Sequence, residues 1–175
     1  FSTSVHKALM EIDPNWETYD GLVVCGTHTP HDVEEIIEKI REARESKRPF
    51  LGICFGHQLA WIEMFRAAGL KDATSEEFGK GTFVVKKRPK GLRVGIHPVN
   101  FRGEIRMESF WNNYEVDSSQ LISLFPGLLP TDNFDFFELD DHPFFFTMQF
   151  HPEYQSSKDK PHPILKKFLE ICRQR

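Results

Sequence analysis

The apolar residues in the first half of the chain alternate between short continuous runs and stripes at helical spacing. The runs at 21–26 (GLVVCG) and 49–54 (PFLGIC) are bounded by Gly or Pro, which is typical of buried strands. The stripes at 32–48 and 57–70 follow them and predict two helices. Two apolar strands joined by a crossover helix favour a parallel sheet with helices on both faces and a right-handed crossover.

The start of each helix carries its own signal. At the second helix of the chain, Asp32 stands where an N-cap is expected and Glu35 follows three residues on, which predicts a capping box. The opening residues 1–9 (FSTSVHKAL) also favour a helix, with Val5 and Leu9 on one face. Because the sequence begins at Phe rather than Met, we expect a truncated N-terminus.

The second half of the chain is richer in strands. Runs at 81–88, 91–99, 103–109 and 144–150 read as strands divided by Gly, Pro and charges, and a helical pattern returns at 163–175. The sequence therefore predicts an α/β fold. We expect an open, mainly parallel, flavodoxin-like sheet with helices on both faces and an added β-rich segment, in one domain over 1–175.

Composition narrows the function classes. The net charge of −4 comes from interspersed acids and bases, so we expect no nucleic-acid partner. No apolar run approaches the roughly 20 residues that cross a bilayer, so no membrane partner is expected either. Three cysteines without regular spacing do not form a disulfide framework. They favour a reducing compartment, and we predict a cytoplasmic location and no cofactor.

Cys54 lies where the second apolar run turns into a helical pattern, between Gly52 and Gly56. This spacing matches the nucleophile elbow G-x-S-x-G with Cys in place of Ser, in which a tight strand-to-helix turn exposes the nucleophile. The following helix N-terminus favours a thiolate, and its backbone N–H groups can face a developing oxyanion. Most free cysteines are small buried hydrophobes, but the flanking glycines favour a nucleophile here.

A thiol nucleophile needs a base and a group that orients the base. His151 directly follows the predicted strand that ends at Phe150, at the strand end where open α/β sheets bind ligands. Glu153, two residues further on, is placed to accept the imidazole Nδ1–H. A lone histidine at a strand end is usually solvated or buried in the core. The combination with Cys54 and Glu153 favours a catalytic base.

Two other groups of residues have candidate roles. Cys25, His28 and His31 have a C-x-x-H-x-x-H spacing, but a structural zinc needs four ligands and none completes this set, so no metal site is predicted. We expect His28 and His31 to border the active-site cleft instead, because they follow a strand. Phe110 and Trp111 are candidates for lining a substrate pocket.

The segments 52–58 (GICFGHQ) and 149–153 (QFHPE) resemble the class I (triad) glutamine amidotransferases. More narrowly, the chain resembles the glutaminase domain of CTP synthase, through these segments and through 73–79 (ATSEEFG) and 141–148 (DHPFFFTM). This resemblance implies a cysteine hydrolase that cleaves the side-chain amide of glutamine or a related compound through a thioester and releases ammonia.

The resemblance also implies residue roles. Cys54 would be the nucleophile, His151 the general base and acid, and Glu153 the orienting carboxylate. The oxyanion donors would be the backbone N–H of Phe55 and one from the turn at Gly26. Substrate-binding positions would be Thr27, Gln58, Glu77 and Asn113.

Two of these positions depart from the family pattern. Thr27 replaces the second glycine of a P-G-G-F-G-like turn, and its Cβ narrows the pocket. Asn113 stands directly before Tyr114, where the family carries an Arg that holds the α-carboxylate of glutamine. Losing one charge-assisted contact to a buried anion costs roughly 1.5–3 kcal/mol. The identity of the amide substrate is therefore open.

Three hypotheses remain. The first is the amidotransferase-like hydrolase, with a small-molecule amide substrate and a synthetase domain or subunit that receives the ammonia; no G-x-x-x-x-G-K-[ST] loop occurs in this chain. The second is a catalytically altered or non-enzymatic binding or regulatory module, which the Asn113 change permits. The third is a cysteine hydrolase or isomerase of the same fold class that acts on an unrelated substrate.

Overall fold

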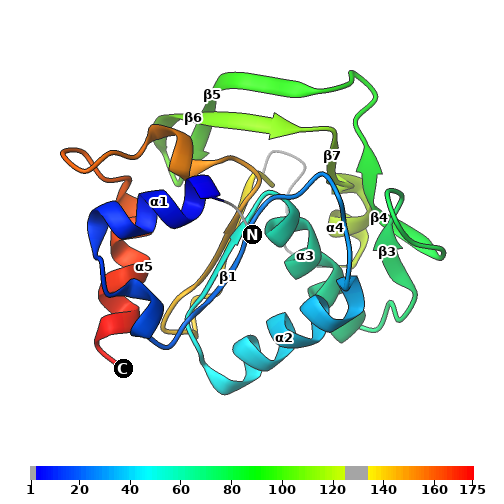
Figure 1. The fold of residues 1–175 in the computed structure, drawn as a ribbon. Helices are drawn as coiled ribbons and strands as arrows, with labels where there is room; N and C mark the ends of the chain where they lie inside the picture. The colour runs from blue at the N-terminus through cyan, green and yellow to red at the C-terminus, as the bar shows by residue number, and fades with distance from the viewer. Residues whose placement is uncertain (1–2, 125–133) are drawn as a thin grey trace.

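The computed structural model describes residues 3–124 and 134–175. Its main sheet has the strand order β1 (Leu22–Val24), β2 (Phe50–Ile53), β9 (Phe145–Met148) and β8 (Phe136–Glu138). The first three strands are parallel, and β8 pairs with β9 in the antiparallel sense. The predicted open, mainly parallel sheet is confirmed (Figure 1).

Helices cover both faces of this sheet, as predicted. Figure 1 shows α1 (Thr3–Ile12) and α5 (Pro163–Arg173) on one side and α2 (Val33–Ser46) and α3 (Phe55–Ala67) on the other. Side chains of successive residues along a strand point to opposite faces. Phe50 accordingly packs into the core under α2 and α3, whereas Leu51 packs under α1 and α5. The two cores hold the sheet edge that carries the site in place.

The helix α3 is buried on nearly all of its faces, whereas the sequence predicted burial of a single apolar stripe. Every residue from Phe55 to Glu63 is buried. The reason is that α3 contacts the main sheet, α2 and the β-rich segment at once. Its one buried carboxylate, Glu63, is neutralised by Arg44 of α2, whose Nε and a terminal nitrogen donate to it at 2.8 and 2.6 Å. The helix α3 is therefore fixed between the main sheet, α2 and the β-rich segment.

The predicted capping box of α2 is wrong. Asp32 holds the N-cap position, but its φ of 52° is left-handed and its side chain makes no capping hydrogen bond. Its carboxylate instead accepts from Nδ1 of His31 at 3.0 Å. At the chain start, by contrast, Val5 and Leu9 of α1 share the buried face that the sequence predicts, while residues 1–2 lie outside the described chain.

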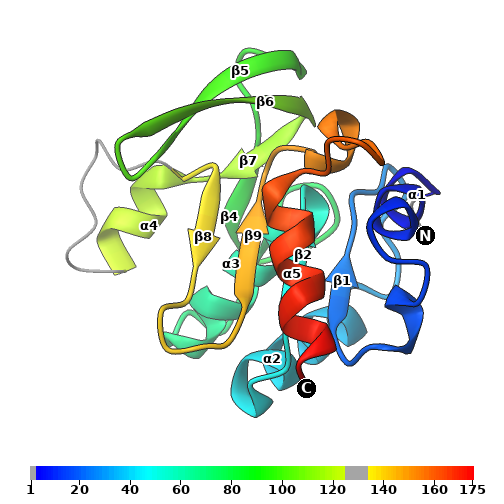
Figure 2. The ribbon, with the colours of Figure 1, turned by 90° about the vertical axis from the view of Figure 1, so that its left-hand side faces the viewer.

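The β-rich segment forms two small sheets above the carboxyl ends of β1, β2 and β9 (Figures 1 and 2). The first contains β3 (Ala73–Ser75), β4 (Thr82–Lys87) and β7 (Tyr114–Val116). The second is a long hairpin of β5 (Arg93–Phe101) and β6 (Glu104–Asn112). Between β7 and β8 lies α4 (Ser118–Leu124), and short 3-10 helices span Trp16–Thr18 and Pro152–Gln155. Within the described ranges, no helix combines the length and apolarity needed to cross a bilayer.

His57, near the start of α3, makes the fold sensitive to acid. Its ring is fully buried, with Nδ1 2.7 Å from the Thr147 hydroxyl and Nε2 3.1 Å from the Phe134 carbonyl oxygen. A neutral ring satisfies both, because Nδ1 accepts and Nε2–H donates. Burial lowers the pKa of His57 from 6.5 to about 4, even though Asp135 and the two hydrogen bonds favour the charged ring.

We expect the free energy of unfolding to fall as the pH is lowered from 6.5 toward 4. In this window the unfolded chain binds a proton at His57 that the folded chain excludes, and the loss reaches roughly 3 kcal/mol at most. Urea unfolding at pH 7.5 and 4.5 measures it. The His57→Gln variant, compared with wild type, should lose this part of the pH dependence; an unchanged difference would contradict the assignment to His57.

Candidate active site

A strained turn between β2 and α3 carries Cys54. Its backbone has φ 54° and ψ −100°, a region that a residue with a Cβ rarely adopts. The turn is held in place because the Cys54 N–H donates to the Met148 carbonyl at 2.7 Å and its carbonyl accepts from Gln58 at 3.1 Å. Such strain is concentrated at functional sites, where the surrounding structure maintains it. The predicted tight strand-to-helix turn is present.

The flanking glycines allow this turn to pack. A Cβ on Gly56 would lie 2.2 Å from the Val24 carbonyl oxygen of β1, and one on Gly52 would lie 3.0 Å from the Gly56 backbone. A Cβ on Gly26, in the turn after β1, would come within 3.1 Å of the His151 ring and 3.7 Å of the Cys54 sulfur. The three glycines thus bring two strand ends and the helix start into direct contact around Cys54.

His151 and Glu153 form the pair that the sequence predicts. The His151 Nδ1 lies 3.1 and 3.2 Å from the two carboxylate oxygens of Glu153, and the carboxylate is 1% exposed. The His151 N–H donates to the Ser109 carbonyl of β6 at 2.7 Å, which ties the loop to the long hairpin. The ring of Tyr154 stacks on the imidazole, with centroids 4.6 Å apart and planes 8° from parallel. Glu153 and Tyr154 together therefore fix the orientation of the imidazole.

The electrostatics of this pair favour an imidazolium beside the sulfur. Burial opposes the charged ring, but interactions with Cys54 and Glu153 outweigh it and raise the pKa of His151 to about 10. The Nε2 atom of His151 is buried and has no hydrogen-bond partner in the described part of the chain. This nitrogen is therefore free to exchange a proton with a group bound next to the sulfur.

Removing the charge of Glu153 tests this arrangement. In Glu153→Gln we expect the pKa of His151 to fall by about one unit or more, because a nearby opposite charge typically contributes that much. Histidine NMR titration of both proteins would measure the pKa of His151. The matched control is Glu38→Gln, which neutralises an exposed carboxylate on α2 and should leave the His151 titration unchanged. Equal His151 titrations in all three proteins would contradict the prediction.

Gln149 contacts the candidate nucleophile, although the sequence interpretation assigned it no role. Its Nε2 lies 3.5 Å from the Cys54 sulfur, and its Oε1 accepts from Nε2 of Gln58 at 3.2 Å. Gln58 also donates to the Tyr114 carbonyl at 3.0 Å. The thiol itself faces the Trp111 carbonyl oxygen at 3.7 Å. The signal for Gln149 was its place in the QFHPE segment, two residues before His151.

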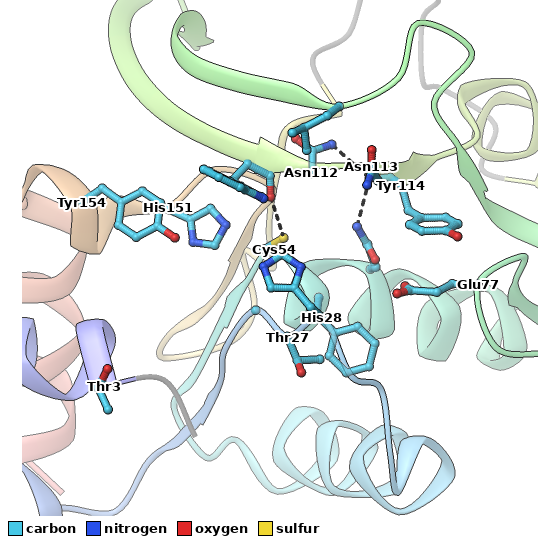
Figure 3. Close-up of a pocket in the computed structure, with 15 residues that line it drawn as sticks. Thr3, Thr27, His28, Cys54, Glu77, Asn112, Asn113, Tyr114, His151 and Tyr154 are labelled. Carbon is cyan, nitrogen blue, oxygen red and sulfur yellow. Dashed lines mark hydrogen bonds between the residues drawn. The ribbon is translucent and has the colours of Figure 1, made fainter.

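A pocket of about 410 Å³ opens above Cys54 (Figure 3). All the predicted site residues line it except Glu153, which lies buried behind His151. Trp111 and His28 also line the pocket, in agreement with their predicted places. Two expectations are wrong: His31 is not among the lining residues, and Phe110 is buried in the core, with the Arg93 guanidinium 3.6 Å above its ring.

Glu77 is the acidic residue of this pocket, and it lies across Cys54 from His151 in the view of Figure 3. Burial raises its pKa, while the charge of nearby His28 acts in the opposite direction. Asn113 is exposed at the pocket rim, where its carbonyl accepts from the Arg88 N–H at 2.7 Å. Within the described ranges, no group of three or more His, Cys, Asp or Glu side chains is arranged to hold a metal ion.

A strained cysteine lies on a strand-to-helix turn, next to a buried His–Glu pair at the carboxyl edge of a parallel sheet. This is the geometry of a nucleophile elbow in an open α/β fold. A family model described as class-I glutamine amidotransferase matches residues 2–171. The chain therefore belongs to the class-I glutamine amidotransferase family, and the family resemblance seen in the sequence is confirmed.

Within this family the chain is similar to CTP synthases. It is 36% identical over 180 residues to the CTP synthase of Methanoregula boonei and 33% identical over 190 residues to that of Ruminiclostridium cellulolyticum. These alignments cover 89% and 93% of this chain but 34% and 36% of the relatives. The chain thus spans about a third of the length of these relatives.

A solved structure has the same fold. It is the glutaminase domain of the Trypanosoma brucei CTPS with bound acivicin, which matches with a TM-score of 0.79 and 21% sequence identity. The match covers 98% of this chain and 88% of that one. The α/β architecture with its added β-rich segment is thus that of a CTPS glutaminase domain.

Proposed function

We propose that this protein is a glutaminase-type cysteine hydrolase, which cleaves the side-chain amide of glutamine or a related compound and releases ammonia. The observation that carries the proposal is the grouping of Cys54, His151 and Glu153: a thiol on a strained turn, beside an imidazole whose pKa is raised and whose orientation is fixed by a buried carboxylate. Membership of the class-I glutamine amidotransferase family supports it.

In the first half of the reaction, the Cys54 thiolate attacks the carbonyl carbon of the bound amide, and a C–S bond forms. The negative charge moves to the carbonyl oxygen, which accepts from the Phe55 N–H at the start of α3 and from an N–H of the turn at Gly26. The tetrahedral species collapses as the C–N bond breaks. His151 gives its Nε2 proton to the leaving nitrogen, so ammonia departs and a thioester remains.

In the second half, His151 is neutral and takes a proton from a water molecule as the water oxygen attacks the thioester carbon. The C–S bond then breaks, the electron pair returns to sulfur, and a carboxylic acid is released. The thiolate and the imidazolium are restored. Glu153 stays ionised throughout and stabilises the imidazolium whenever it forms. Gln149 donates to the sulfur and so keeps it in place between turnovers.

The similarity to CTP synthases supports a synthetase domain or subunit as the receiver of ammonia, because the chain spans only about a third of those relatives. A second candidate function is a binding or regulatory module that keeps the fold without turnover. Asn113 favours it, since an amide replaces the expected cation at the pocket rim. The two functions differ in whether a covalent acyl group forms on Cys54.

Ammonia release and protein mass together test the proposal. We expect the purified protein to release ammonia from L-glutamine or its amide-bearing analogues, and rapid acid quenching to trap an acyl adduct whose peptide contains Cys54. An adduct accompanied by a single equivalent of ammonia and no further release would indicate blocked deacylation. A folded protein that binds these amides without forming either product would replace the hydrolase with the binding module.

A further inference from the structure

We propose that this site selects amides whose far end carries a positively charged amine and no free carboxylate. The proposal rests on the proposed amide hydrolysis at Cys54 and names the class of substrate. The selected group lies at the end of the ligand opposite the scissile amide.

The described lining of the pocket contains no permanently charged cation. Among the lining residues of the described chain there is no Lys or Arg, while Glu77 supplies a carboxylate. The residues outside the described ranges, 1–2 and 125–133, contain neither Lys nor Arg. Two arginines of the β-rich segment are occupied elsewhere. Arg93 of β5 is paired with Asp135 at 2.9 and 3.3 Å, and Arg88, directly after β4, forms an ion pair with Glu115.

The imidazole of His151 in the floor of the pocket is not an available cation for a ligand carboxylate. Its Nδ1 is paired with the buried carboxylate of Glu153 at 3.1 and 3.2 Å. His28 is the other lining side chain that can become cationic, and it is exposed, with its ring edge toward Trp111 at 6.5 Å. A second carboxylate brought into this pocket is therefore repelled, whereas an ammonium is attracted.

The polar groups left over in the pocket are mainly acceptors. Both N–H bonds of the Gln58 amide are used, toward the Tyr114 carbonyl and toward Gln149, so Gln58 offers its oxygen to a ligand. Asn112 is similar: its nitrogen donates to the Tyr114 carbonyl at 3.0 Å, while its buried oxygen has no hydrogen-bond partner within the described chain. Gln58, Asn112 and Glu77 thus line the pocket as hydrogen-bond acceptors, which complements a primary ammonium because that group only donates.

The distribution of these groups fits one orientation of the ligand. Figure 3 shows Glu77 and His151 on opposite sides of Cys54, with Asn112 and Asn113 along the top of the pocket. The amide of a substrate lies at Cys54, so its charged end points toward Glu77. At the rim, Asn113 presents an uncharged amide, which gives an anion neither charge nor a bidentate fork.

A matched pair of ligands tests the charge preference without turnover. The compound 4-aminobutanamide keeps the amide and the amine of glutamine and lacks its carboxylate, whereas 4-carbamoylbutanoate keeps the carboxylate and lacks the amine. We expect calorimetry with the Cys54→Ala protein to give a Kd for the first compound that is lower by about tenfold or more. Equal binding, tighter binding of the anion, or binding of neither would overturn the proposal.

Variants of the pocket residues test which side chains cause the preference for a cationic ligand. Glu77→Gln should remove most of it, and Asn113→Arg should reverse it by giving the rim a carboxylate-binding fork. Glu38→Gln is the control, because it removes an exposed carboxylate on α2 that does not line the pocket, and it should leave the preference in place. If Glu77→Gln keeps the full preference, the assignment to this pocket is wrong.

Turnover separates this proposal from the hydrolase itself. With the wild-type protein we expect kcat/KM for L-glutaminamide, whose α-carboxylate is masked as an amide, to exceed that for L-glutamine by about tenfold or more. Faster hydrolysis of L-glutamine would refute the charge preference and leave the hydrolase standing. If the protein bound 4-aminobutanamide more tightly than 4-carbamoylbutanoate but released ammonia from no amide, the proposed hydrolase activity would be wrong and the charge preference would be retained.

Discussion

Replacing Cys54 by alanine is expected to lower the rate of ammonia release by about 10⁴-fold or more, because loss of a covalent nucleophile has effects of that order in hydrolases with a triad. The remaining side chains can bind the amide but supply no atom for the thioester. The acyl adduct should disappear from the protein mass, while ligand binding persists because Gln58, Glu77 and Asn113 are untouched. Coupled ammonia detection and intact mass spectrometry measure both effects.

Cys172 provides the matched control. It is buried on α5, and burial, together with the negative charge of Asp20, raises the pKa of its thiol to about 12, so it stays a protonated core side chain at neutral pH. Cys172→Ala should lower the melting temperature and leave the adduct on Cys54. If Cys54→Ala retained ammonia release within tenfold of wild type, the reaction would not proceed through Cys54 and the proposed thioester would be wrong.

The sequence predicts the centre of this site because its signals are local. Gly52, Cys54 and Gly56 determine one tight turn, and His151 and Glu153 stand two residues apart after one strand, so each group depends on a few neighbouring positions. The same holds for the parallel sheet, whose strands are continuous apolar runs. The turn and the His–Glu pair lie close together because β2 pairs with β9. The apolar pattern and the order of the strands along the chain favour this pairing.

Features that depend on distant contacts were not predictable in this way. The contact of Gln149 with Cys54 requires the side chain of one strand end to meet the turn after another. Phe110 was expected at the pocket, but alternation along β6 turns it into the core and leaves Trp111 facing out. One local feature was missed as well: Asp32 has a left-handed backbone conformation, which a capping pattern does not reveal, and its side chain pairs with the neighbouring His31.

Gly56→Ala is expected to destabilise the fold by about 3 kcal/mol or more, against the usual direction of such a change. Alanine in a helix is normally more stable than glycine by roughly 0.5–1 kcal/mol. Here, however, the new Cβ would lie 2.2 Å from the Val24 carbonyl oxygen, and this neighbour is strand backbone rather than a flexible side chain. Strand β1 or the first turn of α3 must shift, and the core packs against both.

Gly69→Ala separates this steric effect from the loss of glycine flexibility. A Cβ there meets nothing within 4 Å, but the φ of +114° makes the substitution strained. Its cost should stay near 1–3 kcal/mol, the range for one strained residue. Urea unfolding of both variants measures the difference. If Gly56→Ala proved as stable as wild type, β1 and α3 could move apart without a loss of stability. The close contact between them would then not be the cause of the strained turn at Cys54.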